Sequence, residues 1–338
     1  MKLERGINLG GYLSQCVHST EHYDAFIQEE DIRKIASMGF DHVRLAIDYE
    51  VLEDEYGRTR EEGFAYVTRV VEWCKRQGLN IVLDLHKAYG YDFNNAGDQK
   101  KNILFTNKMV QKRFVNLWIK IAEHYANETH VAFELLNEVV EKENAEAWNL
   151  LIAETVDAIR RIARDTIIIY GGIQWNSVKT LKLLEKPKDE NILFTFHFYE
   201  PLLFTHQKAH WTISQTEDIY YPEAMDYYRT KSLPIGYQGE VVCKAQSQTM
   251  GTEFITEMVM EAVTAAKNAG VTLYCGEFGV IDQAPVEDTL RWFTDVDTVF
   301  RQFGIGCAVW TYKEMDFGLI GEHYAPIREQ LLTLWNRK

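Results

Sequence analysis

Long apolar runs are missing from this sequence of 338 residues, and so is any cluster of basic residues. No stretch approaches the roughly 18 consecutive apolar residues that a membrane-spanning helix needs. The formal net charge is −14, and Lys and Arg form no basic arm or stripe. We therefore expect neither a membrane nor a nucleic acid as a partner, whereas an uncharged substrate suits such a surface.

Cysteines are few, odd in number and widely separated. The chain has five of them, with no CxxC pair, at positions 16, 74, 243, 275 and 307. Most of them lie within apolar runs. We expect reduced, packed thiols rather than a disulfide framework or a zinc site.

The start of the chain also lacks a recognisable targeting segment. It reads MKLERGINLGG and enters a strand pattern directly, without the apolar region of a signal peptide. The expectation is an intracellular protein as the sequence is written, or a secreted protein whose leader has been removed.

Apolar residues are plentiful, and they recur in two alternating patterns. They make up 46% of the chain, which is ample for a large core. Between β-rich segments lie helical patterns such as 61–78 and 145–163, in which apolar residues recur three and four positions apart. Eight segments have the composition of strands: 5–9, 41–46, 80–86, 131–137, 166–172, 192–199, 271–277 and 305–311.

Eight strands that are each followed by a helix predict an α/β fold, the (β/α)8 or TIM barrel, as a single domain over residues 1–338. Gly39, Gly78, Gly270 and Gly304 stand just before strands, where helices are expected to end. The alternative is an open doubly wound sheet with a phosphate-binding loop after the first strand. The segment NLGGYLSQ lacks the GxGxxG spacing of that loop, so the barrel is favoured.

One connection is unusually long. About 50 residues follow the sixth strand before the next helical pattern begins, a length that indicates a functional loop or a small subdomain. Because this segment follows a strand, we expect residues 200–252 to form an inserted subdomain over the C-terminal face of the barrel.

Polar residues stand at the C-terminal ends of most predicted strands, where barrels of this kind carry their catalytic groups. Each could serve packing or ion pairing alone, but their occurrence at the same end of several strands indicates a site. The set consists of Arg44, His86, Asn137, Glu138, His197, Tyr199, Glu277 and Trp310.

Two members of this set are carboxylic acids, Glu138 after the fourth strand and Glu277 in the seventh. Glycoside hydrolysis needs such a pair, one group to protonate the leaving oxygen and one to attack the sugar. Tryptophan adds a flat apolar face for a sugar ring. Glu134 shares the inward face of Glu138 but lies one layer deeper, so we interpret it as a structural carboxylate with a basic partner.

These motifs resemble those of family 5 of the glycoside hydrolases, the cellulase family. The resemblance rests on Arg in HVRLAID, His in LDLH, Asn-Glu in ELLNE, His-x-Tyr in FHFYEP, Glu in CGEFG and Trp in AVWTY, and it covers nearly the full chain. The segments GINLGGY and HQKAHW are similar to a clostridial endoglucanase subgroup with an extra subdomain after the sixth strand.

The resemblance implies a retaining endo-β-1,4-glucanase that cleaves internal bonds of cellulose-type and mixed-linkage β-glucans. It implies that Glu138 is the acid/base and Glu277 the nucleophile. Asn137 would bond the sugar 2-hydroxyl, while Arg44 and Tyr199 would keep Glu277 ionised. A neutral acid at Glu138 requires a raised pKa, for which the nearby negative charge of Glu277 is the simplest cause.

The remaining roles also come from the resemblance. His197 would orient Glu138, His86 would contact the sugar beside the cleaved bond, and Trp310 would form its floor. Two positions depart from the family pattern, and both could alter substrate preference. Lys87 stands where relatives often have a second histidine, and Trp175 stands where a polar residue is common.

Aromatic residues in the long segment after the sixth strand are suited to stacking on sugars. We expect Phe204, Trp211, Tyr220 and Tyr221 to contribute to substrate binding there, with a packed subdomain core as the alternative.

Other functions stay open at this point. Within the family these are an exo-β-1,3-glucanase, to which DLHKAYGYDFNNAG is faintly similar, and a β-mannanase. Outside it are a carbohydrate-binding barrel without turnover and a metal-dependent sugar isomerase, which would leave the arginine and the tryptophan without a purpose. We expect a monomer that acts on a β-glucan and needs no metal or cofactor.

Overall fold

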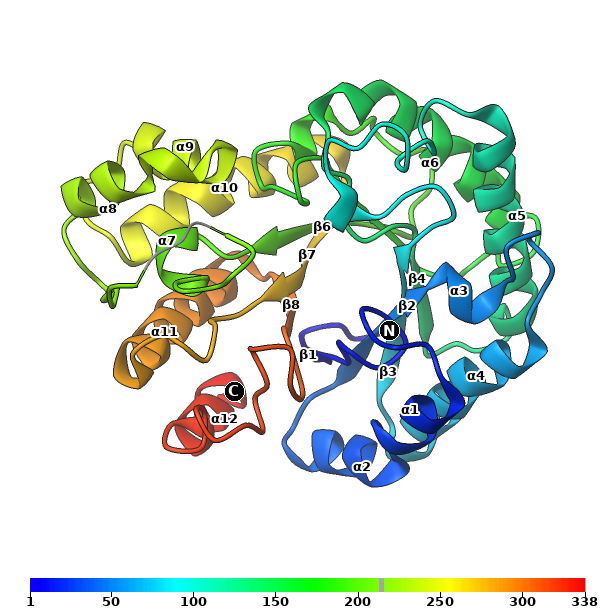
Figure 1. Ribbon diagram of the computed structural model, residues 1–338, viewed down its shortest axis with the longest axis horizontal. Coiled ribbons are helices and arrows are strands. Elements are labelled where there is room, and N and C mark those ends of the chain that lie inside the picture. Colours follow the sequence, from blue (N-terminus) through cyan, green and yellow to red (C-terminus); the bar gives the residue numbers. More distant parts are fainter. Residues whose placement is uncertain (213–215, 338) are drawn as a thin grey trace.

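Eight parallel strands close into a barrel in the computed structural model, which describes residues 1–212 and 216–337 (Figure 1). Each strand pairs with the next, and β1 also pairs with β8. The predicted fold class is thereby confirmed. The strands are β1 Arg5–Asn8, β2 His42–Asp48, β3 Asn80–Lys87, β4 Val131–Glu134, β5 Ile168–Gly171, β6 Ile192–Phe198, β7 Thr272–Phe278 and β8 Gly306–Val309.

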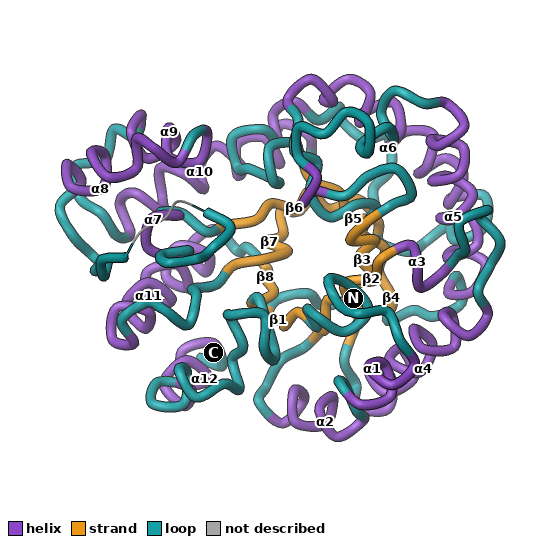
Figure 2. The backbone as a smooth tube through the Cα atoms, viewed as in Figure 1, coloured by secondary structure: helices purple, strands orange, loops and turns teal. Residues whose placement is uncertain are grey.

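Helices surround the ring of strands, as Figure 2 shows in purple around orange. The α-helices are α1 Thr20–Ala25, α2 Glu29–Ser37, α3 Tyr49–Leu52, α4 Glu61–Gln77, α5 Lys108–Tyr125, α6 Ala145–Arg160, α7 Leu202–Thr205, α8 Met225–Ser232, α9 Tyr237–Lys244, α10 Thr252–Ala269, α11 Val286–Phe303 and α12 Arg328–Trp335. Short 3-10 helices are η1 Phe93–Asn95, η2 Lys142–Asn144, η3 Leu181–Leu183 and η4 Leu233–Ile235.

Strand alternation decides which side chains face the inside of the barrel. In β3, Ile81, Leu83 and Leu85 belong to the large apolar core beneath the helices, whereas Val82 belongs to a separate small cluster. Since successive side chains point to opposite faces, Asp84 and His86 share the inward face with Val82. The two chemically distinctive residues of β3 are thus directed into the barrel, toward its C-terminal end.

The helices begin and end where the sequence patterns predict. Helix α4 carries acidic residues in its first turn and Lys75 and Arg76 in its last, an arrangement that complements the helix dipole. Gly78 then ends α4 in a left-handed conformation, with a φ of 70°. Gly39, Gly270 and Gly304 likewise have positive φ values at helix ends.

Two expectations about the barrel need correction. The fourth strand ends at Glu134 rather than at residue 137, because the chain then leaves the regular pairing with β5. The backbone N–H of Asn137 donates instead to the Leu85 carbonyl of β3. The fifth strand is not followed by an α-helix. Residues 172–191, all of which are described, contain only η3, which packs against α10.

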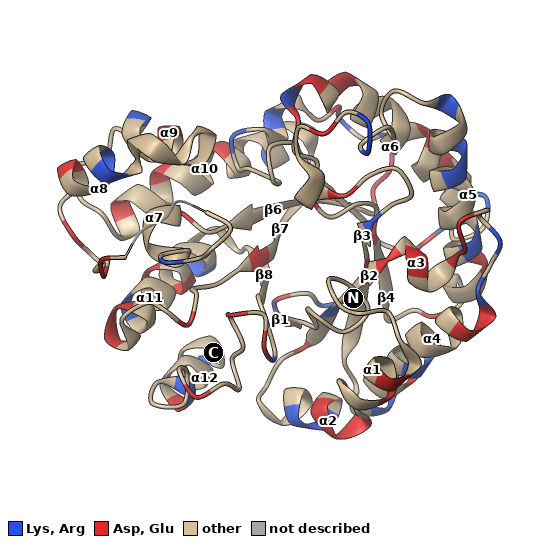
Figure 3. Ribbon diagram, in the orientation of Figure 1, with Lys and Arg blue, Asp and Glu red and all other residues tan. Residues whose placement is uncertain are grey.

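All five cysteines are free thiols, as expected, and three of them are buried. Lys and Arg are interspersed with Asp and Glu over the helices, and Figure 3 shows no basic stripe in this view. Within the described residues, no helix combines the length and the apolar character that crossing a membrane requires.

The segment after β6 forms helices α7, α8 and α9, which lie beside α10 at the edge of the barrel (Figure 1). Phe204 and Tyr221 are buried in its core with ring centroids 5.3 Å apart, so the expectation that they stack on sugars is wrong. Tyr220 is 52% exposed but does not line the cleft described below. Trp211 is 49% exposed and does line it.

A close approach between α3 and α4 gives a stability prediction. A Cβ atom on Gly63 would lie 1.6 Å from the backbone oxygen of Val51, so Gly63→Ala forces the two helices apart. We expect a loss of about 3 kcal/mol or more in the free energy of unfolding, as for overpacked cores. Ala65→Ser, which adds one heavy atom at an exposed position of the same helix, is the control and should cost only about 0.5 kcal/mol. Equal midpoints in denaturant for the two variants would contradict this packing account.

Candidate active site

One buried guanidinium organises the end of the barrel. Arg44 of β2 is completely buried and donates to both oxygens of Glu134, at 2.7 and 2.9 Å. It also donates to Oε1 of Glu277 at 2.8 Å and to the side-chain oxygens of Asn8 and Asn137, each at 2.9 Å. The expected basic partner of Glu134 is therefore the same arginine that was expected to bind Glu277.

Each carboxylate oxygen of Glu277 has a donor. Arg44 binds Oε1, and the hydroxyl of Tyr199 donates to Oε2 at 2.9 Å. Burial and the charge of Glu277 raise the pKa of Tyr199 well above its usual value, so the phenol remains a neutral donor. Positive charge and hydrogen bonds both favour the ionised form of a carboxyl group. Glu277 is accordingly held in a fixed orientation, with one donor on each oxygen.

Glu138 has a different environment. Its Oε1 lies 2.7 Å from Nδ1 of His197, and among the described residues no Lys or Arg forms an ion pair with it. Burial raises the pKa of Glu138 to about 7. The expected cause was the charge of Glu277. Burial is instead the leading cause, and the negative charge that adds to it is that of Asp84.

His197 is held in one tautomer. Burial lowers its pKa to about 4, so the ring is neutral near pH 7. The side-chain amide of Asn176 lies 3.4 Å from Nε2 of His197 and also donates to the Asn137 carbonyl. Since Nε2 accepts from this amide, Nδ1 carries the proton and donates to Oε1 of Glu138. The other oxygen, Oε2, is left to carry the proton of the neutral Glu138.

Asn137 and His86 are oriented by the same buried network. The Asn137 oxygen accepts from Arg44, so its amide nitrogen is free to donate toward the cleft. Nδ1 of His86 lies 2.6 Å from Asp84, which also pairs with Arg44 at 3.1 Å. Burial is the largest single influence on His86 and disfavours its imidazolium, but the charge and the hydrogen bond of Asp84 together with the charge of Glu277 raise the pKa of His86.

These groups face a cleft of about 760 Å³ at the C-terminal end of the barrel. His86 and Trp310 form one wall, with their rings nearly parallel at 9° and 5.8 Å apart. Trp175, from the loop after β5, and Trp211, from the segment after β6, also line it. Nine of the ten predicted site residues therefore border one cleft, and Arg44 lies beneath it.

Four polar residues of the site were missed in the sequence, and three of them support the residues already described. Asn8 fixes Arg44 and donates to backbone carbonyls of β7 and β8. Asp84 binds His86 and Arg44, and Asn176 binds His197. The sequence does contain a signal for Asn8 and Asp84, because both are polar residues within predicted strands. Asn8 stands in the strand beside that of Arg44, and Asp84 lies two positions before His86. The fourth missed residue, Glu200, has no such partner and is taken up below.

Two groups of side chains in the described part of the chain have metal-ligating atoms within 4.8 Å of one another. One is the site itself: Glu138, His197 and Glu277. Here both oxygens of Glu277 already accept from Arg44 and Tyr199, and His197 already donates to Glu138. The hydrogen bonds therefore suit proton transfer and nucleophilic attack rather than metal ligation.

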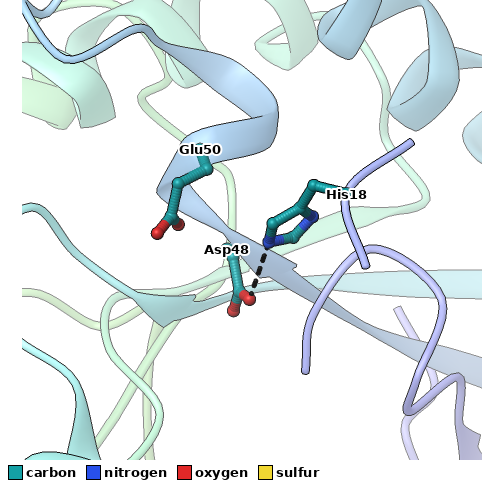
Figure 4. Close-up of side chains that lie close together, drawn as sticks. All are labelled: His18, Asp48 and Glu50. Atoms are coloured by element: carbon teal, nitrogen blue, oxygen red, sulfur yellow. Dashed lines mark hydrogen bonds and ion pairs between the residues drawn. The ribbon is translucent and has the colours of Figure 1, made fainter. Parts of the chain in front are cut away.

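The second group, His18, Asp48 and Glu50, lies at the end of β2 (Figure 4). Nε2 of His18 lies 3.2 Å from Oδ2 of Asp48, and this hydrogen bond raises the pKa of His18 to about 10. Lys87 lies 3.5 Å from the same oxygen and 3.3 Å from Asp92. Both His18 and Lys87 thus pair with Asp48. This group is an ion-pair cluster rather than a metal-binding site.

A pair of buried carboxyl groups, one bound by a guanidinium and a phenol and one with its pKa raised to about 7 by burial, at the mouth of a (β/α)8 barrel defines a glycosidase, an enzyme that hydrolyses glycosidic bonds. Comparison with known proteins agrees. The family model for cellulase, glycosyl hydrolase family 5, matches residues 6–316. The chain belongs to this family.

Named relatives extend over the whole chain. Endoglucanase C of Acetivibrio thermocellus is 40% identical over 353 aligned residues, which cover 100% of this chain and 99% of that protein. Cellodextrinase A of Ruminococcus flavefaciens is 39% identical over 302 residues, covering 89% of this chain and 83% of that protein.

Solved structures show the same barrel. Thermotoga maritima Cel5A in complex with mannotriose has a TM-score of 0.76 and 24% identity, over 98% of this chain and 97% of that one. Clostridial cellulose synthase subunit Z from Clostridioides difficile has a TM-score of 0.79 and 22% identity, over 99% of this chain and 100% of that one. At these identities the likeness is one of fold.

The raised pKa of Glu138 predicts a pH profile. As an acid, Glu138 must be protonated in the free enzyme, a condition met below pH 7 and lost above it. We expect kcat/KM for cellotetraose to fall tenfold per pH unit on the alkaline side, with an apparent pKa of about 7. Glu138→Gln should remove this alkaline limb and lower kcat/KM by about 10²- to 10⁴-fold.

An aryl cellobioside with a good leaving group serves as the control, because its first step needs little protonation. Its glycosylation rate should depend weakly on pH above 7 and should survive Glu138→Gln better than cellotetraose hydrolysis does. A parallel loss on both substrates would contradict the assignment of Glu138 as the acid.

Proposed function

We propose that this protein is a retaining endo-β-1,4-glucanase that hydrolyses cellulose-type and mixed-linkage β-glucans by double displacement. The observation that carries the proposal is the pair Glu138 and Glu277, with one oxygen of each within 4.8 Å of the other. Retaining glycosidases have such closely spaced carboxyl groups, about 5–5.5 Å apart, whereas inverting enzymes need room for a water between them.

In the first step a Glu277 oxygen attacks the anomeric carbon while Glu138 gives its proton to the leaving glycosidic oxygen. The C–O bond to the leaving sugar breaks, and an ester bond to Glu277 forms. Asn137, which has its amide nitrogen free, donates to the 2-hydroxyl of the sugar. Arg44 and Tyr199 aim the nucleophile, since they bind one oxygen each.

In the second step a water molecule replaces the leaving sugar. Glu138, now a carboxylate, takes a proton from this water while the water oxygen attacks the anomeric carbon. The ester bond to Glu277 breaks, and Glu277 departs as a carboxylate. The neutral His197 donates to Glu138 in both steps, so it stabilises the anion formed by the first one. The enzyme returns to its starting protonation state without a metal in any step.

Internal cleavage and linkage are supported by the relatives and by the shape of the site. The two names at about 40% identity are an endoglucanase and a cellodextrinase, and both span nearly the full chain. The cleft is bordered by residues from opposite sides of the barrel, which suits a chain that passes across it. The substrate proposed is therefore an uncharged β-glucan chain, and the active species is a monomer.

Product profiling tests the substrate class. We expect short oligosaccharides from carboxymethyl-cellulose and barley β-glucan, with a rapid fall in viscosity, and much slower release from laminarin and mannan. Glucose as the first product from laminarin would instead favour an exo-β-1,3-glucanase, and preferential release of manno-oligosaccharides would favour a β-mannanase.

Stereochemistry tests the double displacement. Each displacement inverts the anomeric carbon, so two of them retain it, and proton NMR in the first minutes should show the β-anomer from cellotetraose. Glu277→Ala should lose at least about 10⁴-fold in kcat, and azide should restore part of the turnover of an aryl cellobioside as the α-glycosyl azide. An initial α-anomer from the wild-type enzyme would contradict the nucleophile assignment.

We further propose that residues 200–252 act as an inserted subdomain that binds substrate. Trp211 is the exposed aromatic residue of this segment that borders the cleft. Trp211→Ala should raise KM for long glucans about 2- to 10-fold and leave an aryl cellobioside unaffected, the loss expected of one aromatic contact. Tyr220→Ala, which removes an exposed aromatic group of the same segment away from the cleft, is the matched control and should change neither. Equal losses on both substrates for Trp211→Ala would refute the binding role.

A further inference from the structure

A third acidic side chain lines the cleft, and the double displacement does not use it. Glu200 follows Tyr199 directly at the end of β6 and is only 9% exposed. Its Oε2 accepts the backbone N–H of Tyr199 at 3.0 Å, and its backbone carbonyl accepts from the indole of Trp292 at 3.0 Å. The backbone and one oxygen of Glu200 are thus fixed.

No Lys, Arg or His within residues 1–212 and 216–337 forms an ion pair with Glu200, and no side chain there hydrogen bonds to its carboxyl group. Burial raises the pKa of Glu200 to about 7. Backbone hydrogen bonds from Tyr199 and Glu200 and the charge of Lys179 oppose this rise but do not overcome burial. The carboxyl group keeps further acceptor sites for a ligand in the cleft that it lines.

The neighbours of Glu200 are polar residues that line the same part of the cleft. The hydroxyls of Ser177 and Tyr237 lie 3.2 Å apart, and both residues border the cleft. Burial and the negative charge of Glu200 raise the pKa of Tyr237, which places the two side chains within electrostatic reach. Ser177 comes from the loop after β5, and Tyr237 begins α9, so three separate segments converge here.

The order of the strands places this group away from the wall formed by His86 and Trp310. His86 lies in β3 and Trp310 directly follows β8, and in the proposed mechanism this wall holds the sugar that becomes bonded to Glu277. Glu138 must face the oxygen that departs, and it follows β4. Ser177 and Glu200 follow β5 and β6, the next two strands after β4 in the order around the barrel (Figure 2). A leaving sugar that departs past Glu138 would therefore enter the part of the cleft that they border.

We propose that Glu200, together with Ser177 and Tyr237, binds hydroxyl groups of the leaving sugar and so determines the preference for a sugar as leaving group. A carboxyl oxygen that faces a cleft can accept from a sugar hydroxyl, and two hydroxyl side chains can donate or accept as needed. The inference rests on the proposed glucanase function. It makes Glu200 a specificity-determining residue of that reaction.

The experiment compares two substrates that share the glycosylated half and differ in the leaving group. The leaving group of cellotetraose is a sugar, whereas that of 2,4-dinitrophenyl β-cellobioside is a phenolate without hydroxyl groups. Glu200→Ala should lower kcat/KM for cellotetraose about 10- to 100-fold, the loss expected when a buried hydrogen-bond partner is left unsatisfied. For the aryl substrate it should change kcat/KM less than about twofold. Glu200→Gln, which keeps an acceptor for the Tyr199 N–H, should fall between wild type and Glu200→Ala on cellotetraose.

A second readout uses the glycosyl-enzyme, which forms from the aryl substrate without any sugar leaving group. Added cellobiose then competes with water, and the fraction of transfer product measures acceptor binding on the leaving side. We expect this fraction to fall by a similar factor in Glu200→Ala. Glu240→Ala, an exposed carboxyl group on α9 paired with Lys244, is the matched control and should change neither readout.

Three outcomes are distinguishable. Losses confined to cellotetraose and to transfer support the proposal. Equal losses on both substrates overturn it, because Glu200 would then act through Tyr199 or through folding, and unchanged values for both also overturn it. A wild-type enzyme inactive on every β-1,4-glucan would instead defeat the proposed function, and the transfer assay with aryl glycosides of other sugars would still test Glu200.

Discussion

The site depends on one buried positive charge. Arg44 lies without solvent exposure inside the barrel, where an unpaired cation would be strongly destabilising, so its five donors must all find acceptors. Two donors bind Glu134 at the end of β4, and the other three bind Asn8 of β1, Glu277 of β7 and Asn137. Asp84 of β3 adds an ion pair to the same guanidinium. The guanidinium therefore fixes the relative positions of several strands at the point where the chemistry takes place. A lysine could not do the same, because it has a single ammonium group in place of a planar fork of donors.

This arrangement separates the two glutamates by environment. Glu277 is bound by the guanidinium of Arg44 and the phenol of Tyr199. Glu138 is buried beside the imidazole of His197, which burial keeps uncharged. Because burial disfavours the charged form, Glu138 keeps its proton to about pH 7. Two identical side chains thus have the different environments that the proposed nucleophile and acid require. The neutral His197, fixed by Asn176, decides which oxygen of Glu138 carries that proton.

Strand periodicity and the polar residues at strand ends made the barrel and most of the cleft predictable from the sequence. A residue such as Glu138 could be recognised because strand ends meet on one face regardless of side-chain packing. Other features depend on tertiary packing that no local pattern contains. Phe204 and Tyr221 are aromatic residues of the kind that binds sugars, but they pack against each other in the core. Asn176 and Glu200 lie in or beside loops whose path brings them to the cleft, and the leading role of burial in raising the pKa of Glu138 follows only from the folded chain.

Trapping the covalent intermediate tests the central claim most directly, that the Arg44 network presents Glu277 as the nucleophile. A 2-deoxy-2-fluoro-β-cellobioside with a dinitrophenolate leaving group reacts quickly in the first step, while its fluorine slows the second, so the glycosyl-enzyme accumulates. After proteolysis, peptide mass spectrometry should find one 2-fluorocellobiosyl group, and fragmentation should place it on Glu277. A label on Glu138 or Glu134, or hydrolysis of cellotetraose by an enzyme that never becomes labelled, would contradict the account.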